Sequence, residues 1–171
     1  MERKFDAFIS YRHHPVDSAV AAAVQKQLEH FTIPRAVQQK TGKKRIEHIF
    51  RDKEELPVTS DLNDNIGLAL SNSAYLIVIC SPRTKESIWV QKEIETFLKT
   101  HNRENVLTVL AEGEPGDVIP ELLLSEEITT TDANGNEITK TIPREPLSCD
   151  YRMGIRKAKS VELLRLECRI L

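Results

Sequence analysis

Glycine is scarce in this sequence, with six glycines among 171 residues, and none of them forms a G-x-G-x-x-G or a G-x-x-x-x-G-K-[ST] pattern. Both patterns use glycine where the backbone must pass close to a phosphate group before a helix. Their absence excludes the dinucleotide-binding fingerprint of Rossmann domains and the phosphate-binding P-loop.

Cysteine is equally scarce. The three cysteines, Cys80, Cys149 and Cys168, are widely spaced and include no C-x-x-C pair. An odd number at such spacing fits neither a disulfide framework nor a structural zinc site. We therefore expect reduced thiols, a cytoplasmic location and no metal site, since the isolated pair His13-His14 is too short to indicate a metal.

An excess of one charge sign is also missing, because 24 Lys and Arg stand against 26 Asp and Glu, for a formal net charge of −2. This balance argues against a nucleic-acid partner. The longest apolar run, residues 74–80, is too short to span a membrane. An apolar helical pattern continues to Ile170-Leu171, so we expect one domain over 1–171, cut from a longer chain with a further C-terminal module.

What the sequence does contain is an alternation of apolar runs and helical stripes. With 40% hydrophobic residues it can bury a core. Residues 74–80 are apolar without alternation, which is typical of a central strand covered on both faces of a parallel sheet. The alternation predicts an open α/β sheet of five strands with right-handed crossovers. The predicted strands are residues 5–10, 46–50, 74–80, 106–110 and 147–151.

Polar residues predict where the helices begin. Asp17-Ser18 is expected to cap the first helix, Asp61 the second, and Ser160 a last helix over 161–171, while the third begins at Ser87 or Ile88. The polar stretches 38–44 and 112–116 are expected to be loops.

A hairpin is predicted near residues 125–143. Asn134-Gly135 lies between two Thr-rich segments, and this dipeptide favours the tight turn of a hairpin. The strands have few apolar residues, so we expect an insertion that projects from the sheet.

Candidate ligand-binding residues follow from the predicted sheet, because ligands bind at the carboxyl ends of the strands in open α/β sheets. There the sequence has Ser10-Tyr11-Arg12-His13-His14, Arg51-Asp52 and Ser81-Pro82-Arg83. The first group could hold a phosphate through hydroxyl, guanidinium and imidazole groups. It could equally be a solvated loop whose tyrosine packs on the rim. It lacks the acidic cluster of a receiver domain that binds Mg²⁺.

Trp89 and Glu93 stand four residues apart on the predicted third helix, hence one turn apart on the same face. They border the apolar stripe of that helix, whereas Glu95 points away. A carboxylate beside an aromatic ring could bind a sugar hydroxyl or a cationic ring. Taken alone, a glutamate on such a helix is usually a solvated residue.

In combination, these motifs resemble a Toll/interleukin-1 receptor (TIR) domain. The resemblance rests on FDAFISYR at residues 5–12, FRD at 50–52, the apolar run 74–81, and WVQKE at 89–93, in the right order. It covers residues 5 to about 120, while the hairpin segment departs from the usual short connection and the last helix matches loosely. The motifs are most similar to those of NAD-cleaving TIR domains.

The resemblance implies a flavodoxin-like fold, with five parallel strands and helices on both faces, and cleavage of NAD⁺ with release of nicotinamide. By the same matching, Glu93 is expected to be the catalytic glutamate. NAD⁺ is then the substrate, with no further cofactor. The matching assigns substrate binding to Ser10, Tyr11, Arg12, His13, Asp52, Leu62 and Trp89.

The resemblance also implies self-association through the segment Arg51 to Asp61, and a role in bacterial anti-phage defence or signalling. One glutamate suffices for the chemistry, because nicotinamide leaves as a neutral molecule and needs no general acid, unlike ordinary glycosides. Two alternatives stay open. One is a non-catalytic TIR scaffold, adaptor or effector, and the other is a flavodoxin-like domain with an unrelated ligand, which the lack of a Ser/Thr-rich phosphate loop disfavours.

Overall fold

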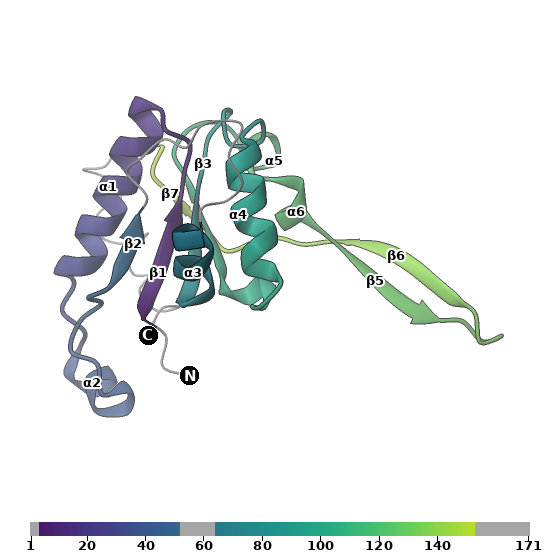
Figure 1. Cartoon of the computed structure of the whole chain (residues 1–171), viewed down its shortest axis with the longest axis horizontal. Helices are drawn as coiled ribbons and strands as arrows, with labels where there is room; N and C mark the ends of the chain where they lie inside the picture. The colour runs from purple at the N-terminus through teal and green to yellow at the C-terminus, as the bar shows by residue number, and fades with distance from the viewer. Residues whose placement is uncertain (1–3, 52–63, 153–171) are drawn as a thin grey trace.

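A five-stranded parallel sheet forms the centre of the molecule (Figure 1). The structure is a computed structural model that describes residues 4–51 and 64–152. The predicted parallel five-stranded sheet is confirmed, as is the central place of the apolar strand 74–80. Across the sheet the strands are β2 (Ile49–Arg51), β1 (Phe5–Ser10), β3 (Ser73–Cys80), β4 (Val106–Leu110) and β7 (Ser148–Asp150).

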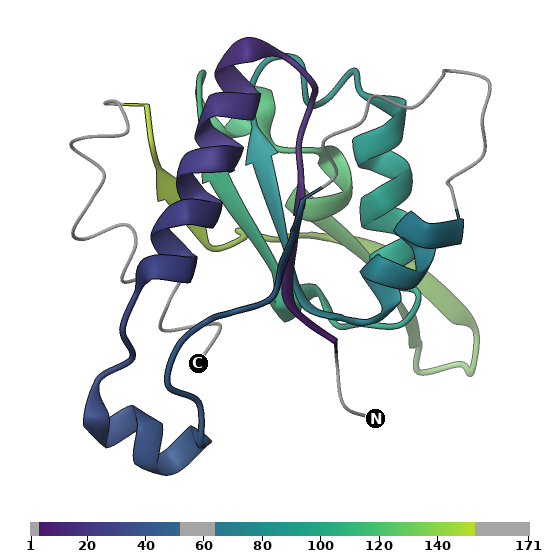
Figure 2. The ribbon, with the colours of Figure 1, turned by 60° about the vertical axis from the view of Figure 1, so that its left-hand side comes forward.

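Helices cover both faces of this sheet, as expected (Figure 2). On one face α1 (Pro15–His30) packs onto alternate residues of β3, including Ile77 and Ile79. On the other face α3 (Asp64–Ser71) and α4 (Ile88–Leu98) pack onto Val78 and its neighbours. The last five residues of β3 are all buried, which explains why this strand is apolar without alternation.

Two predicted helix starts can be compared with the structure. α4 begins at Ile88 and Ser87 is its N-cap, as predicted. The prediction for the first helix is wrong, because α1 begins at Pro15, two residues before Asp17, and its N-cap is His14. The fixed φ of proline suits the first turn of a helix, whose N–H groups have no intrahelical partner.

Short helices replace parts of two predicted loops. The stretch 38–44 lies partly in α2 (Arg35–Thr41), which buries none of its residues and ends at Gly42 with a φ of 73°. Without an apolar stripe, the sequence carried no periodic signal for this helix. The predicted loop 112–116 leads into a helical turn. The remaining short helices are η1 (Arg103–Asn105), α5 (Pro115–Val118) and α6 (Glu121–Leu124).

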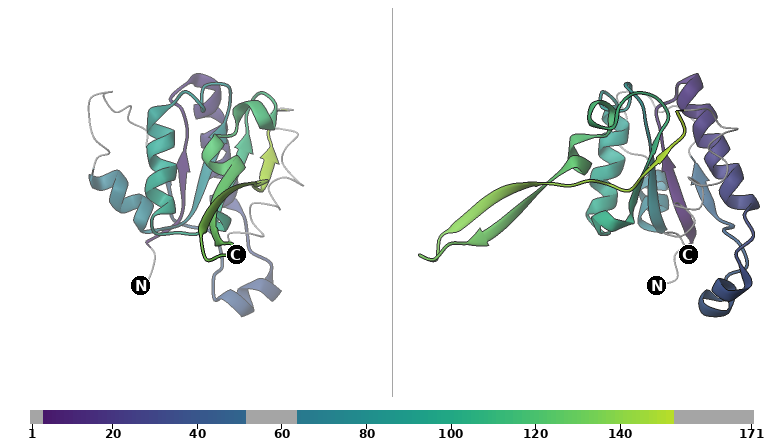
Figure 3. Two further views of the ribbon diagram at one scale, coloured as in Figure 1. Left: turned by 90° about the vertical axis from the view of Figure 1, so that its right-hand side faces the viewer. Right: turned by 180° about the vertical axis from the view of Figure 1, so that it is seen from behind.

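The predicted hairpin is confirmed. β5 (Ser125–Thr131) and β6 (Glu137–Pro143) form a separate antiparallel sheet that reaches away from the body of the domain (Figure 3). Gly135 adopts a φ of 84° in the turn, a conformation that glycine reaches without steric cost.

The described cysteines, Cys80 and Cys149, are buried and form no disulfide with each other. Burial raises the pKa of the Cys80 thiol to about 12. Among residues 4–51 and 64–152, no helix is long and apolar enough to cross a membrane. Several predictions lie outside the described residues. They concern the cap at Asp61, the last helix at 161–171 with its cap Ser160, Cys168, Asp52, Leu62 and most of the segment Arg51 to Asp61.

Candidate functional site

Ser10 and Glu93 meet at the carboxyl edge of the sheet. Ser10 is the last residue of β1 and is buried, and it pairs with Val78 of β3 in the parallel register. Glu93 lies in the middle of α4 and is only 8% exposed. The hydroxyl of Ser10 donates a hydrogen bond to the Glu93 carboxylate. A buried carboxylate needs such partners, so this contact holds Glu93 at the end of β1.

The structure can also be compared with the predictions for Glu95 and Trp89, which lie on the same helix as Glu93. Glu95 is exposed and points away from the sheet, as expected. Trp89 is half-buried one turn before Glu93, and the Lys92 ammonium lies 4.9 Å from the centroid of its ring. This separation is within the range of a cation–π contact.

A cleft of about 380 Å³ opens beside this edge. Arg12, His13 and Trp89 all line it, so three of the predicted substrate-binding residues share one cavity. Glu93 is not among the lining residues of this cleft. The lining consists of Arg12, His13, His14, Arg83, Glu86, Ser87, Ile88 and Trp89. With two arginines and two histidines against one glutamate, the cleft favours an anionic ligand.

Tyr11 is buried at the base of the β1–α1 loop rather than open to the cleft. Its ring lies 5.0 Å from that of His13, and the Arg51 guanidinium carbon lies 5.9 Å from its centroid. Tyr11 thus packs between the loop after β1 and the end of β2. Its predicted role in substrate binding stays a prediction, as do the roles of Ser10, Arg12, His13 and Trp89.

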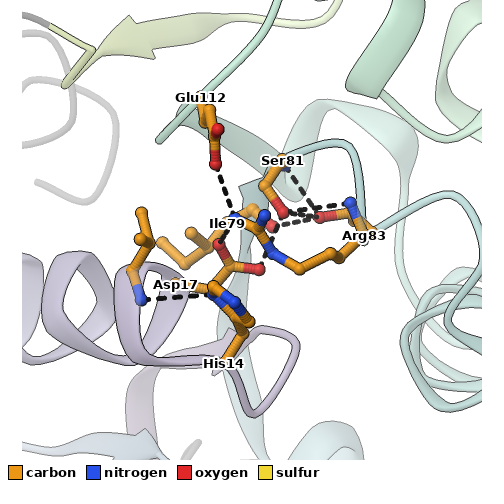
Figure 4. A network of polar contacts seen from close by, with 8 residues as sticks. His14, Asp17, Ile79, Ser81, Arg83 and Glu112 are labelled. Atoms are coloured by element: carbon orange, nitrogen blue, oxygen red, sulfur yellow. Dashed lines mark hydrogen bonds and ion pairs between the residues drawn. The ribbon is translucent and has the colours of Figure 1, made fainter.

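A polar network beside the cleft joins Ser81 and Arg83 to Asp17 and Glu112, two carboxylates that the sequence motifs did not indicate as site residues (Figure 4). The Asp17 carboxylate is fully buried, pairs with the Arg83 guanidinium at 2.9 Å, and accepts a 2.7 Å hydrogen bond from the Ser81 hydroxyl. Arg83 also pairs with Glu112 at 2.7 Å. The network links α1, the β3–α4 loop and the β4–α5 loop. Hydrogen bonds to Asp17 and then to Glu112 raise the pKa of Arg83 above its ordinary value.

One signal in the sequence could have revealed Asp17. It lies three, seven and eleven residues before Val20, Val24 and Leu28, which form the buried stripe of α1. That spacing places the carboxylate on the core face of the helix. A charged residue on an apolar stripe indicates a buried partner, and here the partner is Arg83.

These features define a class of protein: an open α/β domain whose ligand-binding edge holds a buried carboxylate beside a cationic cleft. A TIR domain family model matches residues 7–144, and the chain therefore belongs to the TIR domain family. The resemblance seen in the sequence motifs is confirmed.

The chain is also similar to two proteins of known name. The chain is 36% identical over 115 residues to a protein named NAD(+) hydrolase ApTIR, from Actinoplanes sp., with 65% of this chain and 14% of that protein covered. It thus spans about a seventh of that relative. It is also similar to the TIR domains in the activated Roq1 resistosome that recognises the effector XopQ. That likeness has a TM-score of 0.48 at 21% identity over 66% of this chain and 61% of the other.

Proposed function

We propose that this TIR domain is an NAD⁺ nucleosidase, which releases nicotinamide and forms ADP-ribose or a cyclic ADP-ribose isomer. The name of the 36% identical relative, NAD(+) hydrolase, supports this proposal. The observation that carries it is the hydrogen bond from Ser10 to the buried Glu93, since carboxylates that are buried beside a ligand-binding edge and held by a specific partner are concentrated at functional sites.

In the proposed mechanism, the Glu93 carboxylate stabilises positive charge as the ribose–nicotinamide bond breaks. The transition state resembles an oxocarbenium ion, and a fixed negative charge in a partly dry site lowers its free energy. Ser10 orients the carboxylate through its hydroxyl. Nicotinamide leaves as a neutral base, so the step needs no proton donor. Water then attacks the ribose to give ADP-ribose, or a group of the same molecule attacks to close a ring.

The cleft beside Glu93 would hold the anionic part of the dinucleotide. Arg12 and His13 line it together with Arg83, and guanidinium groups suit bidentate binding of phosphate. NAD⁺ is the substrate in this scheme and no other cofactor takes part. A role in bacterial anti-phage defence, a cytoplasmic location and self-association through the segment Arg51 to Asp61 belong to the same proposal.

One observation favours a second candidate, a non-catalytic TIR scaffold. The cationic cleft is lined by Trp89 and Arg12 but not by Glu93. A scaffold could use the cleft for an anionic segment of another protein, with no chemistry at the glutamate. The experiment below separates the two candidates.

The test compares Glu93→Gln with the matched variant Glu95→Gln on the same helix. Glutamine retains the shape and can still accept the hydrogen bond from Ser10, so both variants should melt within a few degrees of the parent protein. Nicotinamide release from NAD⁺, followed by chromatography, should fall by about 10²- to 10³-fold for Glu93→Gln, the usual effect of removing one electrostatic stabiliser. Glu95→Gln should be nearly silent. No nicotinamide release from the parent protein would favour the scaffold.

A further inference from the structure

His14 presents a hydrogen-bond donor at the cleft. As the N-cap of α1, it accepts a hydrogen bond at Nδ1 from the Val16 N–H at 3.4 Å. A neutral imidazole ring has one protonated and one unprotonated nitrogen, so an accepting Nδ1 places the proton on Nε2. No described residue forms a hydrogen bond with Nε2. Since His14 lines the cleft, this N–H is available to a ligand there.

The Arg83 guanidinium also has N–H groups left for a ligand. Its two carboxylate partners, Asp17 at 2.9 Å and Glu112 at 2.7 Å, both bind Nη2. The other terminal nitrogen, Nη1, has no hydrogen-bond partner among the described residues. Figure 4 shows the side chains of His14 and Arg83 beside that of Asp17. Because the two carboxylates hold the guanidinium in place, binding of a ligand would cost little side-chain entropy.

Two helices begin at this cleft. His14 is the N-cap of α1, Ser87 is the N-cap of α4, and both residues line the cavity. The N–H groups in the first turn of a helix carry partial positive charge, which favours an anion nearby. On their own these termini would not define a binding site, but they add to the donors of His14 and Arg83.

The donors come from two loops and suit a ligand with two anionic groups. Arg12 and His14 lie between β1 and α1, whereas Arg83 and Ser87 lie between β3 and α4. The volume of about 380 Å³ is in the range of small-molecule sites. A diphosphate has acceptor oxygens on two neighbouring phosphorus atoms, so it can accept hydrogen bonds from both loops at once.

We propose that His14 and Arg83 bind a diphosphate group between them, which makes them specificity-determining residues for a dinucleotide. This inference rests on the proposed function, because it places the diphosphate of NAD⁺ beside the edge that holds Glu93. The resemblance to the TIR family assigns neither residue to the substrate. Ser87 precedes Glu93 by six residues on α4, about 9 Å along the helix axis. That distance leaves room for a ribose between the glutamate and the cleft.

The cap and the ligand contact of His14 can be separated, because serine is a good N-cap but lacks the imidazole Nε2–H. His14→Ser should therefore melt within a few degrees of the parent protein. ADP is the probe, since it contains a diphosphate and has no nicotinamide to lose. In calorimetric titrations of the 171-residue chain, His14→Ser should weaken ADP binding about tenfold, the effect of losing one hydrogen bond to a charged group.

The matched control is His30→Ser, which removes an exposed histidine at the other end of α1 and should bind ADP as the parent protein does. Adenosine has no phosphate and should not distinguish His14→Ser from the parent protein. Arg83→Lys retains a cation beside Asp17 but lacks Nη1, so it should also weaken ADP binding about tenfold.

The inference and the proposed function fail in different ways. Absence of ADP binding by the parent protein, or equal ADP affinities of His14→Ser and His30→Ser, would overturn the diphosphate site even where nicotinamide is released from NAD⁺. ADP binding that depends on His14, without any release of nicotinamide, would support the diphosphate site and remove the catalytic role.

Discussion

The Asp17 carboxylate and the Arg83 guanidinium lie 2.9 Å apart, with the carboxylate side chain 0% and the arginine side chain 28% exposed. The pair joins the first turn of α1 to the loop after β3, on two sides of the cleft. An ion pair with one buried member is worth little by itself, but removal of one partner leaves a charge without compensation.

Arg83→Met should therefore destabilise the domain by about 2–4 kcal/mol, below the upper range for fully buried pairs because Arg83 is partly exposed. Urea unfolding followed by circular dichroism would measure this change. Arg144→Met is the matched control, since Arg144 pairs with Glu126 in an exposed setting and should change stability by about 1 kcal/mol or less. The double variant Asp17→Asn/Arg83→Met should recover part of the loss, because it removes both charges.

Ser10→Ala should lower kcat for NAD⁺ cleavage by about tenfold or more, the effect of losing one hydrogen bond to a charged group. KM should stay within a small factor of its original value, because in the proposed function Ser10 orients Glu93 through its hydrogen bond and does not contact the substrate. Ser10→Thr retains the hydroxyl and should restore most of kcat. If KM rises and kcat is unchanged in Ser10→Ala, then Ser10 contacts the substrate instead of orienting the carboxylate.

Arg12→Ala should raise the KM for NAD⁺ by about tenfold or more, because Arg12 lines the cleft and in the proposed function makes a charge-assisted contact to phosphate there. Arg35→Ala, an exposed arginine on α2, is the matched control for the loss of one positive charge. The effect of Arg12→Ala should also shrink at high salt, which screens the attraction. Equal KM values for the two variants would show that Arg12 does not bind the dinucleotide.

Acid should weaken the contact of Asp6 with the segment before β2. Burial raises the pKa of Asp6, but the hydrogen bond from Lys43, the backbone N–H groups of Glu47 and His48 and the charge of Lys43 together lower it below its ordinary value of 3.8. A folded pKa below the unfolded one stabilises the protein above about pH 4, and this contribution is lost as the pH falls through the folded pKa.

The variant Asp6→Asn should accordingly be less stable than the parent protein at pH 7, while the difference should shrink as the pH falls below about 4. Urea midpoints measured from pH 7 into acid would follow this convergence. Glu47→Gln retains the backbone N–H that Asp6 accepts from and alters only an exposed side chain, so its difference from the parent should be smaller throughout. A difference for Asp6→Asn that grows toward low pH would contradict the assignment.

The sequence predicted the sheet and the hairpin because their signals are local. An unbroken apolar run such as 74–80 is typical of a strand covered on both faces, and Asn134-Gly135 favours a turn between two strands. The start of α1 was mispredicted because Asp17 is both a good cap and the partner of Arg83, and only the tertiary structure decides between these roles. The contact between Ser10 and Glu93 joins residues 83 apart, so no local pattern contains it.

The candidate site was also predictable only where its signals are local. Arg12 and Trp89 belong to two motifs that were assigned to one site, and both residues line the same cleft. This assignment was possible because parallel strands end at one edge of the sheet. The separation of Glu93 from the lining of that cleft depends on how α4 is rotated against the sheet, which an amphipathic stripe defines only within about one residue. The charged network of Asp17, Arg83 and Glu112 depends on the relative placement of helix α1 and two loops, which no local pattern contains.

The hairpin leaves the body of the domain and returns to it at one point. Ser125 is the register partner of Pro143, and the Arg144 N–H donates to the Leu124 carbonyl at 2.7 Å. Residues 125–143 could therefore be replaced by a two-residue turn without moving α6 or β7. Because the entropy of closing a connection depends only weakly on its length, the domain and its arm are thermodynamically separable. The connection between β4 and β7 is thus a position where this fold can gain or lose a whole segment while its sheet and its Glu93 edge stay the same.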